Sequence, residues 1–473
     1  MEILYRSLAN NLARGIDAGI YKVGERMPGI RATSSDKGVS AATAVAAYRQ
    51  LELEGYLEAR PRSGFFVRPR KTFSTNEPAP VKTLKKRPSL VNSQERVLNL
   101  LEPIADPAVV KFGAAVPDAS YLPTSALEQA LKKAARMERK HVCNYESPVG
   151  TLALRQQIAK RMTDIGCLTE PDDIIITNGC QEAVYVALRT LTKPGDVVVM
   201  ESPTFHGHLQ AAESLGLKVL EIPSHPRTGI SLQALEMALE RWPVKACMVI
   251  PNFSNPAGAC MPDKKKRELY KLLDNHDIPL IEDDIYGDLS FNQRRPSVIK
   301  SLDKKGSVIY CSSFSKNLAP GLRIGWMIAG RYHNQANYQK FTTSVSSNTI
   351  AQYTIADLMA SGRFVKHLRY MRTELEKAVS VVSEAISQHF PRGTCITKPQ
   401  GGYVLWIEIP DKKIDTEELA RNAIKKNISI APGSLFSASG KFHNYLRISC
   451  AVKWDAQAEE AIAILGKMIR GSA

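Results

Sequence analysis

The spacing of apolar residues over residues 1–68 predicts a small helical unit that ends in a β-hairpin. A first amphipathic helix has apolar residues three and four positions apart, at Ile3, Leu4, Leu8, Leu12 and Ile16. Ser40 can cap a later helix, one face of which carries Ala44, Ala47, Tyr48 and Leu51. Two short strands at 56–60 and 65–67 then flank a turn.

The order of these elements is that of a winged helix-turn-helix. It consists of a first helix, a polar second helix, a capped helix and a basic hairpin. In that fold the capped helix enters the major groove of DNA and the hairpin touches the backbone. The residues expected to contact DNA are Arg31, Ser40, Thr43, Arg49, Arg60 and Arg62. A helical oligomerisation domain with a solvated cationic face is the alternative, but it would not need a basic hairpin.

Periodicity fades over residues 69–107, where Pro, Ser, Thr and Lys accumulate. This composition predicts a linker that is semi-rigid where prolines cluster. Its cations can attract DNA without regard to sequence. A solvated tether kept soluble by its charge is the other interpretation, and both roles can hold.

Residues 108–473 show a different pattern, in which short β-branched runs alternate with segments of helical period. The clearest runs are 173–177, 196–200, 246–250, 279–282 and 308–310. The alternation predicts an α/β domain with a mostly parallel sheet covered on both faces. Ligands of such sheets bind at the carboxyl ends of the strands, so candidate chemistry is sought there.

Composition narrows the class of protein only slightly. The chain has 473 residues, 44% hydrophobic and 23% charged, as in soluble proteins of two or three domains. A net charge of +16 favours an anionic partner. The sequence offers no membrane span or signal peptide, so a cytoplasmic location is expected. The eight cysteines lack metal-ligand spacing, which predicts buried reduced thiols and no metal.

The segment after the run 308–310 offers a primary amine at Lys316, with hydroxyls at Ser313 and Ser315 and a cation at Arg323. An amine among phosphate-binding groups is what an enzyme needs to hold pyridoxal 5'-phosphate as a Schiff base. Taken alone, a solvated loop before a buried strand is the simpler interpretation. The other strand ends therefore decide between the two.

Those strand ends supply the remaining groups of a pyridoxal phosphate site. A glycine turn opens a helix whose free N–H groups can bind phosphate, with Gly179, Cys180 and Gln181 as the expected donors. Phe205 can stack on a planar ring. Asn255 and Tyr286 can hydrogen-bond the ring oxygen, and an aspartate of the acidic cluster before Tyr286 can keep the pyridine nitrogen protonated.

The runs GERMPGIR and GVSAATAVAAYRQLELEGYLEARPRSGFFV resemble the DNA-binding domain of GntR-type bacterial regulators. The landmarks that carry this resemblance occur in order, at Pro28, Arg31, Gly38, Val39, Ser40, Tyr48, Leu51, Glu54, Gly55, Tyr56 and Gly64. The sequence departs from the family at Thr33, Ser34 and Lys37, where apolar residues are usual, and at Ala41, where a cation is common.

The motifs TNGCQEAV, ESPTF, NPAG, EDDIY and SSFSKNLAPGLRIGW resemble those of fold-type I aminotransferases. The resemblance covers residues 110–470 and implies a large domain and a smaller C-terminal α+β domain. It implies that Lys316 forms the Schiff base, Asp283 pairs with the pyridine nitrogen, and Asn255 and Tyr286 bind the ring oxygen. Phe205 stands where tyrosine is common, so stacking remains but a hydroxyl contact does not.

Two further roles come from the same resemblance. Arg447 would bind a substrate carboxylate in bidentate fashion, with a surface ion pair as its alternative. Tyr145 lies in a segment similar to one that reaches the phosphate of the partner subunit. A homodimer is thereby implied.

A winged helix-turn-helix joined through a long linker to an aminotransferase-like domain is similar to the architecture of the MocR subfamily of GntR regulators. The resemblance implies a transcriptional regulator that binds a double-stranded DNA operator. It would sense a small amine or amino acid through Schiff-base exchange at Lys316. The alternative is a catalytically active aminotransferase with an appended DNA-binding head. A third hypothesis, with pyridoxal phosphate itself as the effector, leaves Arg447 without a role.

Overall fold

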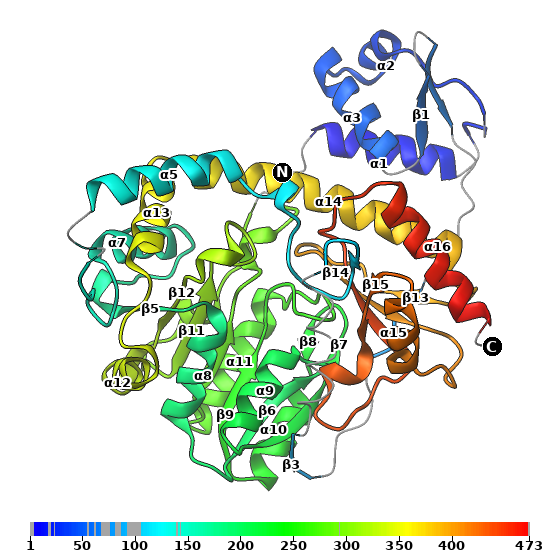
Figure 1. The fold of residues 1–473 in the computed structure, drawn as a ribbon. Helices are drawn as coiled ribbons and strands as arrows, with labels where there is room; N and C mark the ends of the chain where they lie inside the picture. The colour runs from blue at the N-terminus through cyan, green and yellow to red at the C-terminus, as the bar shows by residue number, and fades with distance from the viewer. Residues whose placement is uncertain are drawn as a thin grey trace. The chain divides into compact units, whose positions relative to one another are not determined.

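The computed structural model describes residues 4–17, 20–22, 24–53, 56–60, 63–67, 76–80, 87–91, 106–138, 141, 143–292 and 294–471. The chain divides into two compact units, Met1–Ser74 and Thr75–Ala473 (Figure 1). The first holds the helices and hairpin at the N-terminus, and the second holds the large and small sheets.

The first unit has the predicted order of helices and hairpin. Its elements are α1 (Leu4–Asp17), α2 (Ile30–Lys37), α3 (Ala41–Leu53), β1 (Leu57–Arg60) and β2 (Gly64–Val67), with the two strands antiparallel. The Ser40 hydroxyl accepts from the Thr43 N–H at 3.1 Å, which confirms the predicted cap of α3. The predicted apolar face of α3 is fully buried, whereas Leu4 at the start of α1 is 68% exposed.

Hydrogen bonds accommodate the polar residues of α2. Thr33 is buried, and its hydroxyl lies 2.7 Å from the Tyr48 hydroxyl, which in turn donates to the Pro28 carbonyl at 2.7 Å. The Ser34 hydroxyl donates to the Val39 carbonyl at 2.6 Å. A buried hydroxyl is costly only when it lacks a partner, so α2 packs on α3 despite its departures from the apolar pattern.

The large subdomain of the second unit contains a nine-stranded sheet in the order β3-β7-β6-β9-β10-β11-β12-β5, with β8 beside β7. The strands are β3 (Ser89–Leu90), β5 (Ile174–Thr177), β6 (Val197–Ser202), β7 (Lys218–His225), β8 (Gly229–Ile230), β9 (Val244–Val249), β10 (Leu280–Asp283), β11 (Val308–Ser313) and β12 (Gly325–Ile328). Strands β7, β6, β9, β10 and β11 are parallel, and β12 runs antiparallel between β11 and β5. The sheet is therefore mixed, and β5 still points the same way as β11.

Helices cover both faces of this sheet (Figure 1). Val198 and Met200 of β6 pack toward α8 and α9, whereas the alternate residues Val197 and Val199 pack toward α10 and α11. The helices of this subdomain are α5 (Thr124–Met137), α7 (Leu152–Asp164), α8 (Cys180–Leu191), α9 (His206–Ser214), α10 (Leu232–Arg241), α11 (Asp263–Asn275), α12 (His333–Ser344) and α13 (Thr349–Ala360). The long helix α14 (Arg363–His389) packs on this subdomain with its first half and on the small subdomain with its second. Because both faces are buried, the β6 run is apolar without alternation.

The small subdomain is built on a four-stranded sheet in the order β13-β14-β17-β16. Its elements are β13 (Cys395–Ile396), β14 (Val404–Glu408), α15 (Thr416–Ile424), β15 (Ile428–Ser429), β16 (Ala431–Pro432), β17 (Tyr445–Ser449) and α16 (Ala456–Gly471). Strand β4 (Val110–Lys111), which follows the predicted linker, pairs in parallel with β15. The start of the predicted aminotransferase-like domain thus belongs structurally to the small subdomain.

All eight cysteines are free, in agreement with the predicted reduced thiols. The expectation of burial is wrong for Cys143, which is exposed, and is met only in part by Cys260 and Cys395, which are of intermediate exposure. Among the described residues, no helix is long and apolar enough to cross a membrane. The same part of the chain contains no cluster of His, Cys, Asp and Glu that could hold a metal ion.

Candidate functional site

A cavity of about 110 Å³ lies where the carboxyl ends of β5, β6, β9, β10 and β11 converge. Its lining consists of Cys180, Gln181, Val184, Phe205, Ile250, Asn255, Asp283, Ile285, Tyr286, Ser315, Lys316 and Arg323. Parallel strands place their carboxyl ends at one edge of a sheet, so residues far apart in sequence meet there. Most residues predicted for the cofactor site are brought together in this way.

Lys316 provides the amine of the cavity. Its Nζ donates to the Ala115 carbonyl at 2.7 Å. Burial, followed by repulsion from Arg447 and Arg323, lowers the pKa of Lys316 to about 8. The neutral amine is the nucleophilic form, so this environment supplies a nucleophile close to neutral pH.

Asp283 ends β10 and is held from three sides. One carboxylate oxygen lies 2.9 Å from His208 Nε2, and the other accepts from the Ile285 N–H at 3.0 Å and from the Cys180 thiol at 3.5 Å. Burial, assisted by the charge of Asp283, raises the pKa of Cys180 well above its usual value. The thiol therefore remains a protonated donor toward the carboxylate.

Asn255 and Tyr286 carry polar atoms that have no partner among the described residues. Both side chains are buried, and neither the Asn255 Oδ1 nor the Tyr286 hydroxyl makes a hydrogen bond there. Burial raises the pKa of Tyr286 to about 12, so its hydroxyl is protonated at neutral pH. Buried polar atoms are normally paired, and these two are suited to a polar ligand in the cavity.

The opposite end of the cavity has the features of a phosphate site. Gly179 precedes α8 with φ +84°, and a Cβ at this position would lie 2.4 Å from the Arg323 guanidinium. Glycine is therefore required for the close approach of Arg323 to the helix N-terminus. Arg323 donates to the Asn178 carbonyl and the Ser315 hydroxyl, both at 3.2 Å. A helix N-terminus, a cation and a hydroxyl together favour a bound phosphate.

Ser313 and Gln181 have local partners of their own. The Ser313 hydroxyl is buried outside the cavity lining and accepts from the Ser315 N–H at 3.2 Å, so it supports the turn. Gln181 lines the cavity, while its amide donates to the Gly207 carbonyl at 2.7 Å.

Arg447 lies on β17 of the small subdomain and is only 1% exposed. One guanidinium nitrogen donates to the Gly113 carbonyl, while Nε and Nη1 have no partner among the described residues. Burial lowers the pKa of Arg447 to about 10. A surface ion pair is therefore the wrong interpretation, because the side chain is buried and no described carboxylate pairs with it. Its free donors are suited to a carboxylate ligand.

Backbone carbonyls of residues 113–115 connect the two subdomains at the site. The Gly113 carbonyl accepts from Arg447 of the small subdomain, and the Ala115 carbonyl accepts from Lys316 of the large one. The Tyr403 hydroxyl also donates to the Ala115 carbonyl, at 3.0 Å. This segment was not predicted, because backbone carbonyls leave no signal in a sequence.

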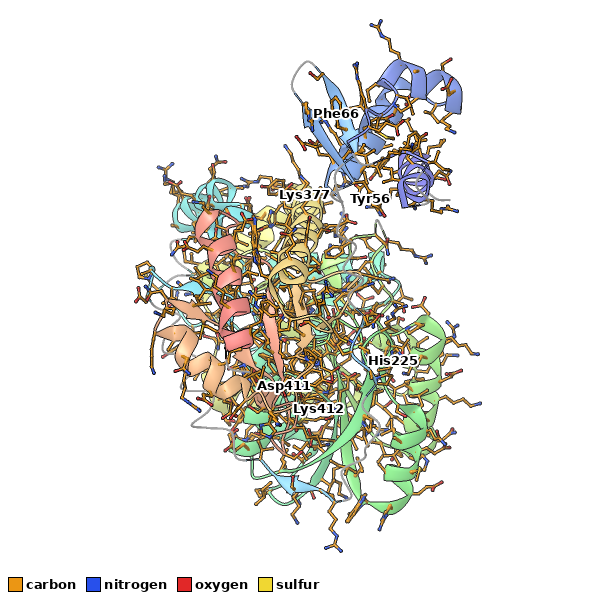
Figure 2. The ribbon with its side chains drawn as sticks, turned by 90° about the vertical axis from the view of Figure 1, so that its right-hand side faces the viewer. Tyr56, Phe66, His225, Lys377, Asp411 and Lys412 are labelled. Carbon is orange, nitrogen blue, oxygen red and sulfur yellow. The ribbon has the colours of Figure 1, made fainter. Side chains whose placement is uncertain are left out.

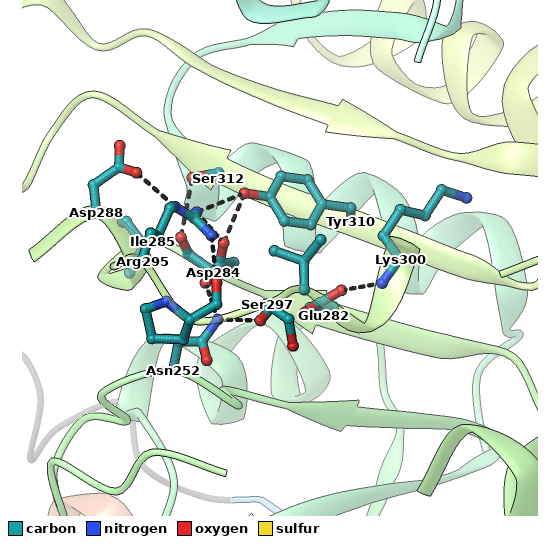
Figure 3. A network of polar contacts seen from close by, with 12 residues as sticks. Asn252, Glu282, Asp284, Ile285, Asp288, Arg295, Ser297, Lys300, Tyr310 and Ser312 are labelled. Atoms are coloured by element: carbon teal, nitrogen blue, oxygen red, sulfur yellow. Dashed lines mark hydrogen bonds and ion pairs between the residues drawn. The ribbon is translucent and has the colours of Figure 1, made fainter. Parts of the chain in front are cut away.

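A buried polar network surrounds Asp284, the residue after Asp283 (Figure 3). Its centre is Arg295, which pairs with the carboxylates of Asp284 and Asp288. Asp284 also accepts from the Tyr310 hydroxyl and the Asn252 amide, each at 2.8 Å. Without the guanidinium, two carboxylates would be left with less compensation in a buried site, which is strongly destabilising.

This network fixes segments that line the cavity. Asn317, which follows Lys316, donates to Asp288 at 3.0 Å. Asp284 directly follows Asp283 in the sequence. The positions of the amine and of the carboxylate therefore depend on contacts outside the cavity lining as well as within it.

The structure also places the remaining predicted residues. Tyr145 is 87% exposed and is not part of the cavity lining.

In the first unit, Arg31 and Arg49 are exposed. Arg60 lies 3.4 Å from Glu58 and stacks over Phe66 at 4.4 Å. The Ser40 and Thr43 hydroxyls lie 2.8 Å apart. Arg62 and residues 69–75, 81–86 and 92–105 of the predicted linker are outside the described residues.

Sequence reasoning missed His208 and Tyr403. His208 lies on α9 close to Phe205, with the two rings edge to face at 5.5 Å. Its signal was its position three residues after Phe205, at the same strand end. Tyr403 lies in the segment QGGYVLW, which was recognised without a role for the tyrosine.

Comparison with known families assigns each of the two units to a family. Residues 4–67 match the model of bacterial regulatory proteins of the gntR family, and residues 109–465 match that of aminotransferase class I and II. An uncharacterized HTH-type transcriptional regulator of Escherichia coli K12, YjiR, is 40% identical over 466 residues, which is 98% of each chain. The chain belongs to the MocR subfamily of GntR regulators.

Solved structures similar to the MocR chain include aminotransferases. Kynurenine aminotransferase of Pyrococcus horikoshii, in complex with PMP, has a TM-score of 0.74 at 29% identity, covering 80% of this chain and 94% of that one. LysN, the alpha-aminoadipate aminotransferase of Thermus thermophilus complexed with N-(5'-phosphopyridoxyl)-L-leucine, has a TM-score of 0.73 at 26% identity, covering 79% and 94%.

The cofactor of this MocR chain is pyridoxal 5'-phosphate, on which the aminotransferase class I and II family depends. The cavity fits it, because the Asn255 Oδ1 and the Tyr286 hydroxyl have no partner among the described residues, and Gly179 leaves space for Arg323 at a helix N-terminus. When bound, the cofactor supplies an aldehyde for amines and an electron-accepting ring. Lys316 would hold the aldehyde, and the Asp283 carboxylate would pair with the ring nitrogen.

The rate at which the chain takes up pyridoxal phosphate should depend on pH through Lys316. Its lowered pKa means that the amine is protonated below a pH of about 8 and neutral above it. The rate should therefore rise up to about pH 8 and then level off, whereas an ordinary lysine, with a pKa of about 10.4, would still be mostly protonated there. Stopped-flow absorbance measures this rate. A rate that climbs steadily up to about pH 10 would contradict the assignment, because it would follow an ordinary lysine.

Proposed function

We propose that this MocR chain is a DNA-binding transcriptional regulator whose cofactor domain senses a small amine or amino acid. The effector would exchange with Lys316 for the Schiff base and would place its carboxylate on Arg447. The observation that carries this proposal is that a gntR-family DNA-binding unit shares one chain with the cavity. The cavity retains the Lys316 amine with its lowered pKa, and the buried Arg447 guanidinium beside it has donors without a partner among the described residues.

The electrostatics of the cavity support an anionic amino compound as the effector. Arg323 and Arg447 are cations close to Lys316, and after burial their repulsion is the next largest cause of its lowered pKa. A carboxylate bound by Arg447 would offset part of this repulsion. A cationic diamine, by contrast, would add a further charge beside Arg447.

A homodimer is part of the proposal. Several large apolar side chains of the second unit are exposed and would be available for contact with a second copy of the chain. They include Met137, Tyr145, Tyr338, Phe341 and Val345, of which Tyr145 is 87% exposed. Two DNA-binding units would then address paired half-sites of an operator.

A working aminotransferase is the second candidate, and the arrangement around Asp283 favours it. The His208 contact at 2.9 Å and the complete set of cavity residues are compatible with turnover. The two functions differ in one measurement. Amines are screened for a change in the absorption of the bound cofactor, and each positive amine is tested for a change in DNA affinity. An amine that changes both supports regulation, whereas rapid turnover with unchanged DNA binding supports the enzyme.

Replacing Arg447 by lysine should weaken the binding of amino acids but not that of amines without a carboxylate. A charge-assisted hydrogen bond is worth roughly 1.5–3 kcal/mol, so the apparent affinity of an amino acid should fall about 10- to 150-fold. The matched control is the decarboxylated amine of the same amino acid, whose affinity should change little. Spectral titration of the bound cofactor measures both. Equal losses for the acid and the amine would contradict the carboxylate role.

A further inference from the structure

The first described residues of the linker touch both subdomains of the second unit. The Asn76 carbonyl accepts from the Ile396 N–H of β13, an edge strand of the small sheet, at 2.9 Å. The next residue, Glu77, forms an ion pair with Arg227 of the large subdomain, in the turn between β7 and β8. Two adjacent residues thus bridge the small and the large subdomain directly after the first unit, which ends at Ser74.

The contact of Glu77 is built into the surface. The Glu77 side chain is only 14% exposed, whereas Arg227 is 65% exposed. Pro78 is buried, and Pro80, although exposed, lines the same pocket as His225 of the large subdomain. Figure 2 shows His225 on the large subdomain and Asp411 on the small one. Prolines at 78 and 80 stiffen the stretch that follows Glu77.

The linker is also attached farther along the chain. Residues 89–90 form β3, which pairs antiparallel with β7 and extends the large sheet. The linker therefore contacts the edge of the small sheet at residue 76 and the edge of the large one at residues 89–90. A free tether would make neither contact.

Arg227, which holds Glu77 on the large subdomain, is connected to the candidate site. The Arg227 carbonyl accepts from the Cys260 N–H at 3.1 Å, and Cys260 lies in the loop that contains Asn255. Ile396 of β13, which holds Asn76 on the small subdomain, belongs to the same sheet as Arg447. An amino acid bound at the site would bridge these subdomains too, from the cofactor in the cavity of the large subdomain to Arg447 of the small one, and would act on their separation.

We propose that Asn76 and Glu77 form a strap that reports the relative position of the two subdomains to the DNA-binding unit. The inference rests on the proposed function, since it supplies the route by which a bound amino acid would alter DNA binding. An effector that changes the distance between Ile396 and Arg227 must move or release the strap. Either event changes the constraint on the chain just after Ser74.

The test uses the full chain and a stable probe, N-(5'-phosphopyridoxyl)-L-leucine, which joins cofactor and amino acid. DNA fragments selected from a random pool by the full chain provide the second ligand. In the unmodified chain, the probe should change DNA affinity by about 5- to 150-fold relative to pyridoxal phosphate alone. Glu77→Gln and Arg227→Gln should bind the probe as before but lose most of the effect of the probe on DNA affinity. The double exchange Glu77→Arg with Arg227→Glu should restore the effect of the probe.

Arg331→Gln is the matched control, because it removes another arginine ion pair of the large subdomain, with Asp277, which does not involve the linker. It should respond like the unmodified chain. Hydrogen exchange of the Ile396 amide, which should be faster in Glu77→Gln, verifies that the strap has loosened. A full DNA response in both single variants would overturn the strap but leave the proposed function standing. Failure of the unmodified chain to bind the probe, or to change its DNA affinity with it, would overturn the proposed function first.

Discussion

Replacing Lys316 by alanine should abolish the visible absorption that the chain acquires with pyridoxal phosphate. No other described lysine lines the cavity formed by the strand ends, so no other amine can take its place there. The lowered pKa of Lys316, about 8, further favours this amine over exposed lysines as the nucleophile. Absorption spectra after removal of free cofactor measure the effect, and the expected loss is complete.

Lys340 provides a matched control for this variant. It is fully buried, and burial lowers its pKa to about 8, as for Lys316. Its Nζ donates to the Val345 carbonyl at the end of α12, and it does not line the cavity. Lys340→Met should therefore keep the spectrum. An unchanged spectrum in Lys316→Ala would overturn the site assignment, whatever Lys340→Met shows.

Removing residues 1–74 should eliminate DNA binding and leave the cofactor spectrum intact. The chain divides into two compact units at this point, and the cavity lies entirely in the second. The helices, the capped α3 and the basic hairpin that would contact DNA all lie in the first. Gel-shift titration against selected fragments and absorption spectroscopy measure the two properties on the same sample.

The full chain carrying Lys316→Ala is the reciprocal control, since it should bind DNA without the cofactor absorption. The two variants together separate the units by function. Retention of a DNA footprint by the truncated chain would refute the assignment of DNA binding to the first unit. Loss of the spectrum in the truncated chain would instead show that the second unit needs the first to fold.

Residues with a local signature were the ones that the sequence could predict. Gly179 was expected before a helix, and it has a positive φ at the start of α8. Ser40 was expected to cap α3 and does so through Thr43. His208 lies only three residues after Phe205, but that position does not reveal its role, which depends on a contact with Asp283, 75 residues away. Contacts of that kind depend on strand order, which local patterns do not contain.

The linker illustrates the same limit. Its composition predicts a stretch without regular structure, and composition determines how stiff such a stretch is. Whether it touches the rest of the chain depends on what lies beside it. The Asn76 carbonyl meets an edge strand, and Glu77 meets Arg227, which follows it by 150 residues. Neither partner could be identified from the linker itself.

The sequence by itself determined the two kinds of unit, the cofactor class and the Lys316 motif, because periodicity, caps and motifs are properties of neighbouring residues. Only the tertiary structure decided that Arg447 is buried with unpaired donors, that the Gly113 and Ala115 carbonyls join the subdomains, and that the linker bridges them. Those features require segments hundreds of residues apart to pack together. Burial, which shifts the pKa values of Lys316 and Arg447, exists only after that packing.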